Sequence, residues 1–166
     1  VEKFEPANTV EQIIGNIKRT GQLLGHTDRA NTLVTKFESR LEELTMGINN
    51  RPRAALYYAN GYTTGKNTLA GQILDLAGFS NIASEIGIHW GRTLPLELLI
   101  MSKPDVIITG TTYPGSSRSE EILKHPALNP LRHVSSTDAN WVCGTPHIVT
   151  AIEDLQTIHP DKMSTK

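Results

Sequence analysis

Short apolar segments alternate with helical ones from residue 53 onward, and this alternation limits the fold more than any other feature. The strand-like segments are 53–59, 80–83, 105–109 and 131–135, and the helical ones are 69–77, 95–102, 119–124 and 146–158. Segment 105–109 reads DVIIT, a β-branched run typical of a buried parallel strand. Strands separated by helices imply a mostly parallel sheet. We therefore predict an α/β fold in three layers, with a mostly parallel sheet covered by helices.

Two amphipathic helices are expected before this sheet. The first begins near Asn8 or Thr9, either of which can cap it, with Glu11 or Gln12 three residues on. The second begins at Thr27 and carries an apolar stripe that needs a sheet or a partner domain to cover it: Ala30, Leu33, Val34, Phe37, Leu41, Leu44 and Ile48. We expect a linker over 1–7, a helical segment over 8–50, an α/β unit over 51–159 and a solvated tail over 160–166.

Composition narrows the functional classes. The chain of 166 residues fits one α/β domain or one lobe of a larger protein, and its net charge of −1 argues against a nucleic-acid surface. The lone Cys143 excludes an internal disulfide and is expected to be a small buried residue. The six histidines lack metal-ligand spacing, so we expect no protein-held metal. The sequence shows no catalytic constellation, and we expect no catalytic residue and no cofactor. No apolar run reaches the roughly 20 residues of a membrane span. The chain starts at Val1 without a signal peptide, so we expect a fragment or a processed chain.

The loop after the first strand permits two interpretations. It reads G-Y-T-T-G-K-N-T over 61–68 and lies where ligands bind in open α/β sheets, at the carboxyl end of a strand. A nucleotide-binding P-loop needs G-x-x-x-x-G-K-[ST], but Gly61 and Gly65 are one residue too close and Asn67 replaces the metal-binding hydroxyl. A P-loop-like phosphate- or nucleotide-binding domain is therefore kept as the alternative to the pocket loop of a solute-binding protein.

Six motifs in order favour the solute-binding interpretation. They are I-x-x-x-G-x-L-L-G at 17–25, R-P-R at 51–53, G-Y-T-T-G-K-N-T with L-A-G-x-x-N-I-A at 76–83, L-P-L-E-L-L at 94–99, K-P-D-V-I-I at 103–108, and W-V-C-G-T-P at 141–146. Over 9–159 the chain resembles the C-terminal lobe of a substrate-binding protein of an ABC importer. The type is the helical-backbone class (class III), whose members bind ferric siderophores, haem or cobalamin.

The resemblance implies a function without catalysis. It implies a periplasmic or lipid-anchored extracytoplasmic lobe that captures an iron complex, a ferric siderophore or haem, for an ABC importer, with cobalamin as the alternative ligand. Segment 8–50 would then be the interdomain helix region, and an N-terminal lobe would complete the ligand cleft. A sensor or scaffold role for such a lobe is a third possibility.

The resemblance also indicates which residues to examine. Tyr62, in the loop after the first strand, and Trp90, before the L-P-L-E motif, occupy positions where the family places aromatic walls against its ligand. Trp141 precedes the last helix in another loop expected on the same rim. Thr111 and Tyr113 lie in a loop whose small residues permit close approach to a ligand. Glu97 matches the carboxylate that pairs with an arginine of the membrane permease.

Overall fold

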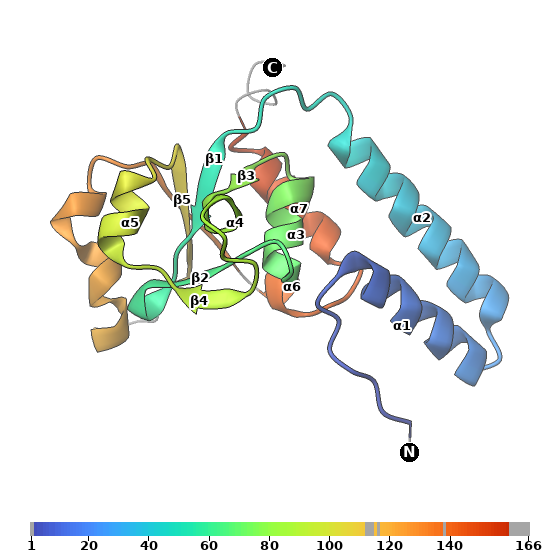
Figure 1. Cartoon of the computed structure of the whole chain (residues 1–166). Coiled ribbons are helices and arrows are strands. Elements are labelled where there is room, and N and C mark those ends of the chain that lie inside the picture. Colours follow the sequence, from blue (N-terminus) through green and yellow to red (C-terminus); the bar gives the residue numbers. More distant parts are fainter. Residues whose placement is uncertain (1, 112–114, 116, 138, 160–166) are drawn as a thin grey trace.

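A four-stranded parallel sheet in the order β3-β1-β5-β6 forms the centre of the protein (Figure 1). The computed structural model describes residues 2–111, 115, 117–137 and 139–159. The sheet strands are β1 (Arg53–Leu56), β3 (Ser80–Asn81), β5 (Val106–Gly110) and β6 (His133–Thr137). Strand β1 lies between β3 and β5, with Ala54 opposite both Asn81 and Val106. The predicted mostly parallel sheet is therefore confirmed.

Helices cover both faces of this sheet, so the three predicted layers are also confirmed. They are α1 (Val10–Leu23), α2 (Thr27–Thr45), α3 (Leu69–Leu76), α4 (Ile82–Glu85), α5 (Leu96–Met101), α6 (Ala139–Val142) and α7 (Ile148–Gln156), with 3-10 helices η1 (Ala59–Gly61), η2 (Arg118–Lys124) and η3 (Pro126–Leu128). Because side chains alternate along a strand, Leu56 and Ile108 pack on α3 and α7, whereas Ala55 and Ile107 pack on α4 and α5.

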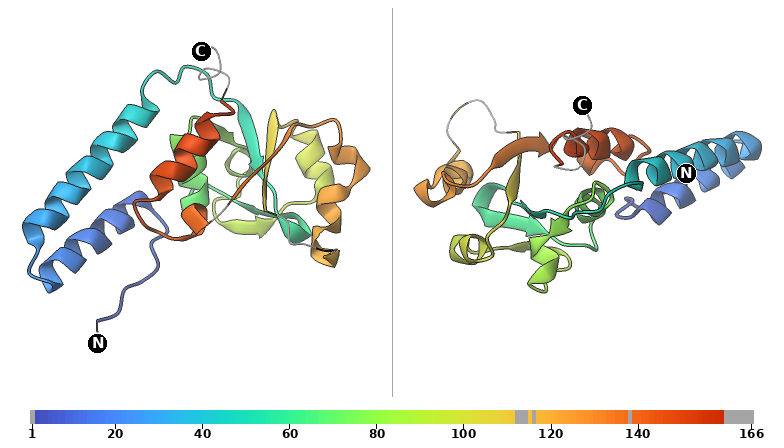
Figure 2. Two further views of the ribbon diagram at one scale, coloured as in Figure 1. Left: turned by 180° about the vertical axis from the view of Figure 1, so that it is seen from behind. Right: turned by 90° about the horizontal axis from the view of Figure 1, so that it is seen from above.

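The first two helices form a hairpin that projects from one side of the sheet (Figure 2). Thr9 caps α1 as predicted, because its hydroxyl accepts a hydrogen bond from the Gln12 amide at 3.2 Å. Most of the predicted stripe on α2 is buried, but Leu33 remains 46% exposed. At its far end α2 is fastened to α7, where the buried Gln156 amide donates to the Leu44 carbonyl at 2.6 Å.

The structure adds one element that the sequence pattern did not predict. Strands β2 (Tyr62–Thr64) and β4 (Gly91–Thr93) pair in antiparallel fashion and form a separate two-stranded ribbon. Three residues a strand are too few to display an alternating pattern. Segment 80–83 was predicted to be a strand, but only Ser80 and Asn81 form β3, and α4 begins at Ile82. The first predicted strand, 53–59, ends earlier than expected, at Leu56.

The segment before α1 also contacts the folded part. Residues 2–7 have no regular secondary structure, as expected for a linker. Ala7 is nevertheless 8% exposed and packs against Gly144, where an added methyl group would lie 2.6 Å from the Ala7 side chain. The predicted tail over 160–166 lies outside the described residues.

Candidate ligand-binding site

The ribbon is held beside the carboxyl end of β1 by a tight turn. Asn60 (φ 56°) and Gly61 (φ 69°) both adopt left-handed backbone conformations that reverse the chain after β1. The Tyr58 amide then donates to the Tyr62 carbonyl at 2.8 Å, and the Leu94 amide donates to the Gly61 carbonyl at 2.8 Å. The turn thereby starts β2 at Tyr62 and brings β4 alongside it.

Two of the predicted aromatic residues belong to this part of the chain, one in the ribbon and one just before its second strand. Tyr62 in β2 is 45% exposed, and Trp90, immediately before β4, is 63% exposed. The Tyr62 hydroxyl reaches across the ribbon to Gly91, the neighbour of Trp90 in the chain. The Trp90 carbonyl accepts a hydrogen bond from the Gly65 amide at 3.2 Å, which ties the loop after β2 to the segment before β4. We call Tyr62 and Trp90 the aromatic platform.

A second tyrosine lies behind the platform. Tyr58 packs against the core on the hairpin side of the sheet. Burial, followed by the neighbouring Tyr62, raises the pKa of the Tyr58 phenol well above its ordinary value of 10.0. Tyr58 therefore stays neutral at physiological pH and places no charge behind the platform.

The structure places the third predicted aromatic residue elsewhere. Trp141 lies in α6, is 3% exposed, and belongs to the core formed with α3 and α7. A tryptophan buried to this extent offers no surface to a ligand in this structure. Its position before the last helix is as expected, but its side chain turns inward.

The remaining ligand candidates lie after β5. Thr111 directly follows the carboxyl end of β5 and is exposed. Tyr113 lies outside the described residues. Of the predicted ligand residues, the structure thus places Tyr62 in the ribbon, Trp90 immediately before its second strand, and Thr111 after a neighbouring strand of the sheet.

Glu97 lies on a different surface, in the first turn of α5. It is exposed, and its neighbours Leu98 and Met101 are 47% and 74% exposed. These two side chains line a hollow of about 470 Å³ together with Ile86 and Arg92. Beneath Glu97 lies the buried Tyr57, whose phenol pKa is raised chiefly by burial and further by the Glu97 charge. Glu97 is thus an accessible carboxylate surrounded by exposed apolar side chains.

The geometry of the G-K-N-T segment argues against a phosphate site. A P-loop holds phosphate with free backbone amides. The amides of residues 65–68 all donate within the protein, to the Trp90 carbonyl at 3.2 Å, the Ser84 hydroxyl at 2.9 Å, the His89 carbonyl at 2.8 Å and the Gly65 carbonyl at 3.1 Å. The segment therefore joins two loops and leaves no amide free to hold a phosphate.

The cysteine and the histidines form no further candidate site in the part of the chain that the structure describes. Cys143 is exposed, so the expectation that it is buried was wrong, because the chain turns outward between α6 and α7. His159 is fully buried, with its Nε2 atom 3.1 Å from the Gly78 carbonyl and its ring edge-on to Phe79. Among the described residues, no three His, Cys, Asp or Glu side chains gather closely enough to hold a metal ion.

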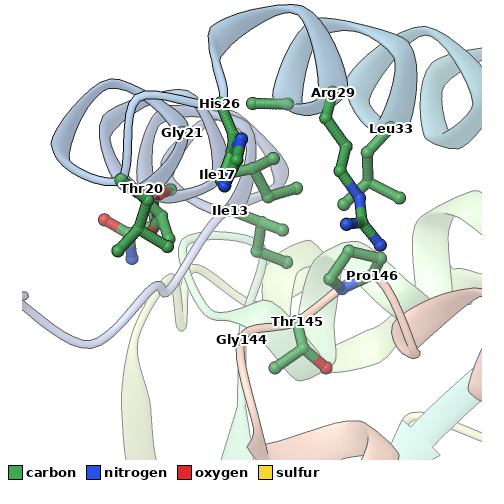
Figure 3. A pocket seen from close by; sticks show the side chains of 13 residues that line it. Ile13, Ile17, Thr20, Gly21, His26, Arg29, Leu33, Gly144, Thr145 and Pro146 are labelled. Atoms are coloured by element: carbon green, nitrogen blue, oxygen red, sulfur yellow. Dashed lines mark hydrogen bonds between the residues drawn. The ribbon is translucent and has the colours of Figure 1, made fainter.

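A second hollow lies on the hairpin side, away from the platform. It has a volume of about 420 Å³ and lies between α1, α2 and the segment before α7 (Figure 3). Its walls are mainly apolar, and Ile13, Ile17, Leu33 and Pro146 are among the residues that line it. It shares no residue with the platform. The sequence pattern did not predict this hollow; Leu33, which lines it, was expected to be covered with the rest of the stripe on α2.

Known proteins resemble this chain in sequence. The family described as periplasmic binding protein matches residues 1–136. A curated "Cobalamin-binding protein" of Halobacterium salinarum is 26% identical over 117 residues, which are 68% of this chain and 32% of that protein. The chain therefore spans about a third of the length of the curated relatives it matches.

Solved structures share the fold. The apo form of the periplasmic heme-binding protein RhuT from Roseiflexus sp. RS-1 has a TM-score of 0.73 and 23% identity, over 90% of this chain and 62% of that one. The periplasmic vitamin B12 binding protein BtuF of Vibrio cholerae has a TM-score of 0.68 and 17% identity, over 94% of this chain and 63% of that one. In the part of this chain that the structure describes, no helix has the length and hydrophobicity to cross a membrane. Because the family match covers residues 1–136, which is most of the chain, the chain belongs to the periplasmic binding protein family.

Proposed function

We propose that the chain is part of an extracytoplasmic substrate-binding protein that captures a bulky metal chelate for an ABC importer, without catalysis. The observation that carries the proposal is the aromatic platform. Tyr62 is exposed on a ribbon that is fixed beside the carboxyl end of β1, and Trp90 is exposed immediately before the second strand of that ribbon. Aromatic side chains offer large contact areas at a small cost in conformational entropy, which suits a large and partly apolar ligand.

An iron complex, either haem or a ferric siderophore, is the first candidate ligand. Structures with this fold include a heme-binding protein and a component of an Fe3+-hydroxamate transport system. Cobalamin is the second candidate, because the curated relatives are named cobalamin-binding proteins. Haem and the corrin ring of cobalamin present a flat surface on which an aromatic side chain can stack, and a ferric siderophore presents a bulky, partly apolar surface that it can contact.

Titration of the full chain with hemin, a ferric hydroxamate siderophore, cyanocobalamin and Mg-ATP tests the proposal. We expect saturable binding of one of the three metal chelates by calorimetry, with Tyr62→Ala and Trp90→Ala each weakening Kd by about tenfold. Leu23→Ala is the matched control, because Leu23 is an exposed apolar side chain on α1, away from the ribbon. Binding of Mg-ATP alone, or of none of the four compounds, would overturn the proposal.

We further propose that Glu97 docks the protein on the importer's membrane subunit. It is an exposed carboxylate beside the exposed Leu98 and Met101, so a basic group surrounded by apolar surface would complement it. Glu97→Gln should lower ligand-stimulated transport in proteoliposomes and leave the Kd for the ligand unchanged. Glu42→Gln, on the exposed face of α2, is the control. Equal transport by Glu97→Gln and the unsubstituted protein would exclude this role.

A further inference from the structure

The hydroxyl end of the Tyr62 side chain lies against Gly91 on the neighbouring strand. Tyr62 pairs with Thr93, so Gly91 is its diagonal neighbour on the same face of the ribbon. A methyl group built on Gly91 would overlap the Tyr62 hydroxyl and would lie 2.6 Å from its Cζ atom and 3.3 Å from its Cε2 atom. All three of the nearest atoms belong to Tyr62. The absent side chain at position 91 therefore leaves the space that the ring occupies.

Nothing in the backbone requires glycine at this position. Several glycines of the chain have left-handed backbone conformations, among them Gly61 and Gly87, but Gly91 does not. Gly91 is also exposed and lies within a strand, where alanine is ordinarily the better residue by backbone entropy. The Tyr62 side chain is thus the nearest neighbour that a methyl group at position 91 would displace.

Gly65 provides the contrast. A methyl group there would overlap the Ile88 carbonyl and would lie 2.7 Å from the His89 Cα atom, which are both backbone atoms. Substitution of Gly65 must therefore move the loop, whereas the nearest atoms to a methyl group on Gly91 belong to the far end of a side chain that can rotate away.

We propose that Gly91 is a positioning residue of the ligand site: because position 91 has no side chain, the Tyr62 side chain can reach across the ribbon and still be exposed to a ligand. This inference rests on the proposed function of the aromatic platform. Holding the ring in this position before binding lowers the entropy that a stacked ligand would otherwise lose. With alanine at position 91 the Tyr62 ring must leave the ribbon, and the platform loses one of its two aromatic side chains.

A double-mutant cycle in the full chain tests the contact without any ligand. In urea denaturation, Gly91→Ala should lower the unfolding midpoint of the unsubstituted protein. In a Tyr62→Ala background the same change should leave the midpoint equal or raise it, because the ring is gone and alanine is the better strand residue. Gly15→Ala is the control: Gly15 lies exposed in α1 with no atom within 4 Å of an added methyl group, so its effect should be the same in both backgrounds. An equal loss from Gly91→Ala in both backgrounds would overturn the inference.

The second arm uses hemin, a ferric hydroxamate and cyanocobalamin as probes. Gly91→Ala should weaken the Kd of the bound probe by about as much as Tyr62→Ala, roughly tenfold, and should add nothing to the loss in the Tyr62→Ala background. An undiminished affinity in Gly91→Ala would overturn the positioning role. If Gly91→Ala and Tyr62→Ala are energetically coupled in urea denaturation but no probe binds, the proposed function is overturned and only the packing contact between the two residues is supported.

Discussion

Thr63→Val should loosen the attachment of the ribbon to the sheet. Thr63 lies in β2, is completely buried, and donates its hydroxyl hydrogen to the Leu56 carbonyl at 2.6 Å. Carbonyls of β1 point alternately to its two neighbours: Ser80 of β3 donates to Pro52, and Asp105, just before β5, donates to Arg53. By this alternation the Leu56 carbonyl points to the side of β3, but β3 has already ended at Asn81. The Thr63 hydroxyl therefore takes the place of a missing strand amide.

The magnitude follows from this geometry. Valine has nearly the same shape as threonine, so the substitution leaves no cavity and removes only the donor. An intramolecular hydrogen bond contributes about 1 kcal/mol, and a buried carbonyl left without a donor costs about 1–3 kcal/mol. We expect Thr63→Val to lower the free energy of unfolding by about 2 kcal/mol.

Thr63→Ser distinguishes the contribution of the hydroxyl to stability from that of the methyl group. It keeps the donor and loses one buried methyl group, worth about 1 kcal/mol. Urea denaturation should therefore rank the unsubstituted protein above Thr63→Ser, and Thr63→Ser above Thr63→Val. Hydrogen exchange at the Leu94 amide, which donates to Gly61, should accelerate in Thr63→Val. A Thr63→Val protein as stable as Thr63→Ser would refute the assigned role of the hydroxyl.

Three further outcomes are expected from the packing and the charges. Trp141→Ala should lower the free energy of unfolding by about 3–5 kcal/mol, whereas Trp90→Ala should change it by about 0.5 kcal/mol or less, as measured in urea. Gln156→Leu should cost about 1–2 kcal/mol in the same assay, because the Leu44 carbonyl loses its buried donor. The Arg53 guanidinium, 2.6 Å from Glu85, lowers the pKa of that carboxyl below its ordinary value of 4.5. Because the folded-state pKa is lowered, the pair stabilises the protein above pH 4.5 and loses this effect as the pH falls through the folded-state pKa. Glu85→Gln should flatten the dependence of the thermal midpoint on pH in that acidic range, and an unchanged slope would contradict the pairing.

Long or strongly apolar elements could be predicted from the sequence, and short paired ones could not. Strand β5 is a run of β-branched residues buried on both faces, so composition alone identifies it. The ribbon depends on pairing between residues about thirty positions apart, Tyr62 with Thr93, and no local pattern encodes that pairing.

The site residues also differ in whether a local sequence pattern could predict them. Trp90 and Trp141 look alike in the sequence, since each lies between two elements, but tertiary packing turns one outward and buries the other. Gly91 has no local signal either, because the need for glycine comes from a side chain on another strand. The loop carrying Tyr62 was predicted because strand and loop are contiguous in sequence, and ligands bind at such strand ends.

The hollow beside the hairpin affects how the folding of this protein should be followed. Anilinonaphthalene sulfonate fluoresces on exposed apolar surface and is widely used to detect partly folded states. In the native protein the hollow already offers apolar walls, with the cationic Arg29 among the residues that line it (Figure 3). We expect the dye to bind the native state there, its rings against the apolar walls and its sulfonate near the guanidinium. A bright dye signal from this protein would then report an intact hairpin, and loss of the signal on adding denaturant would mark the point at which the hairpin separates.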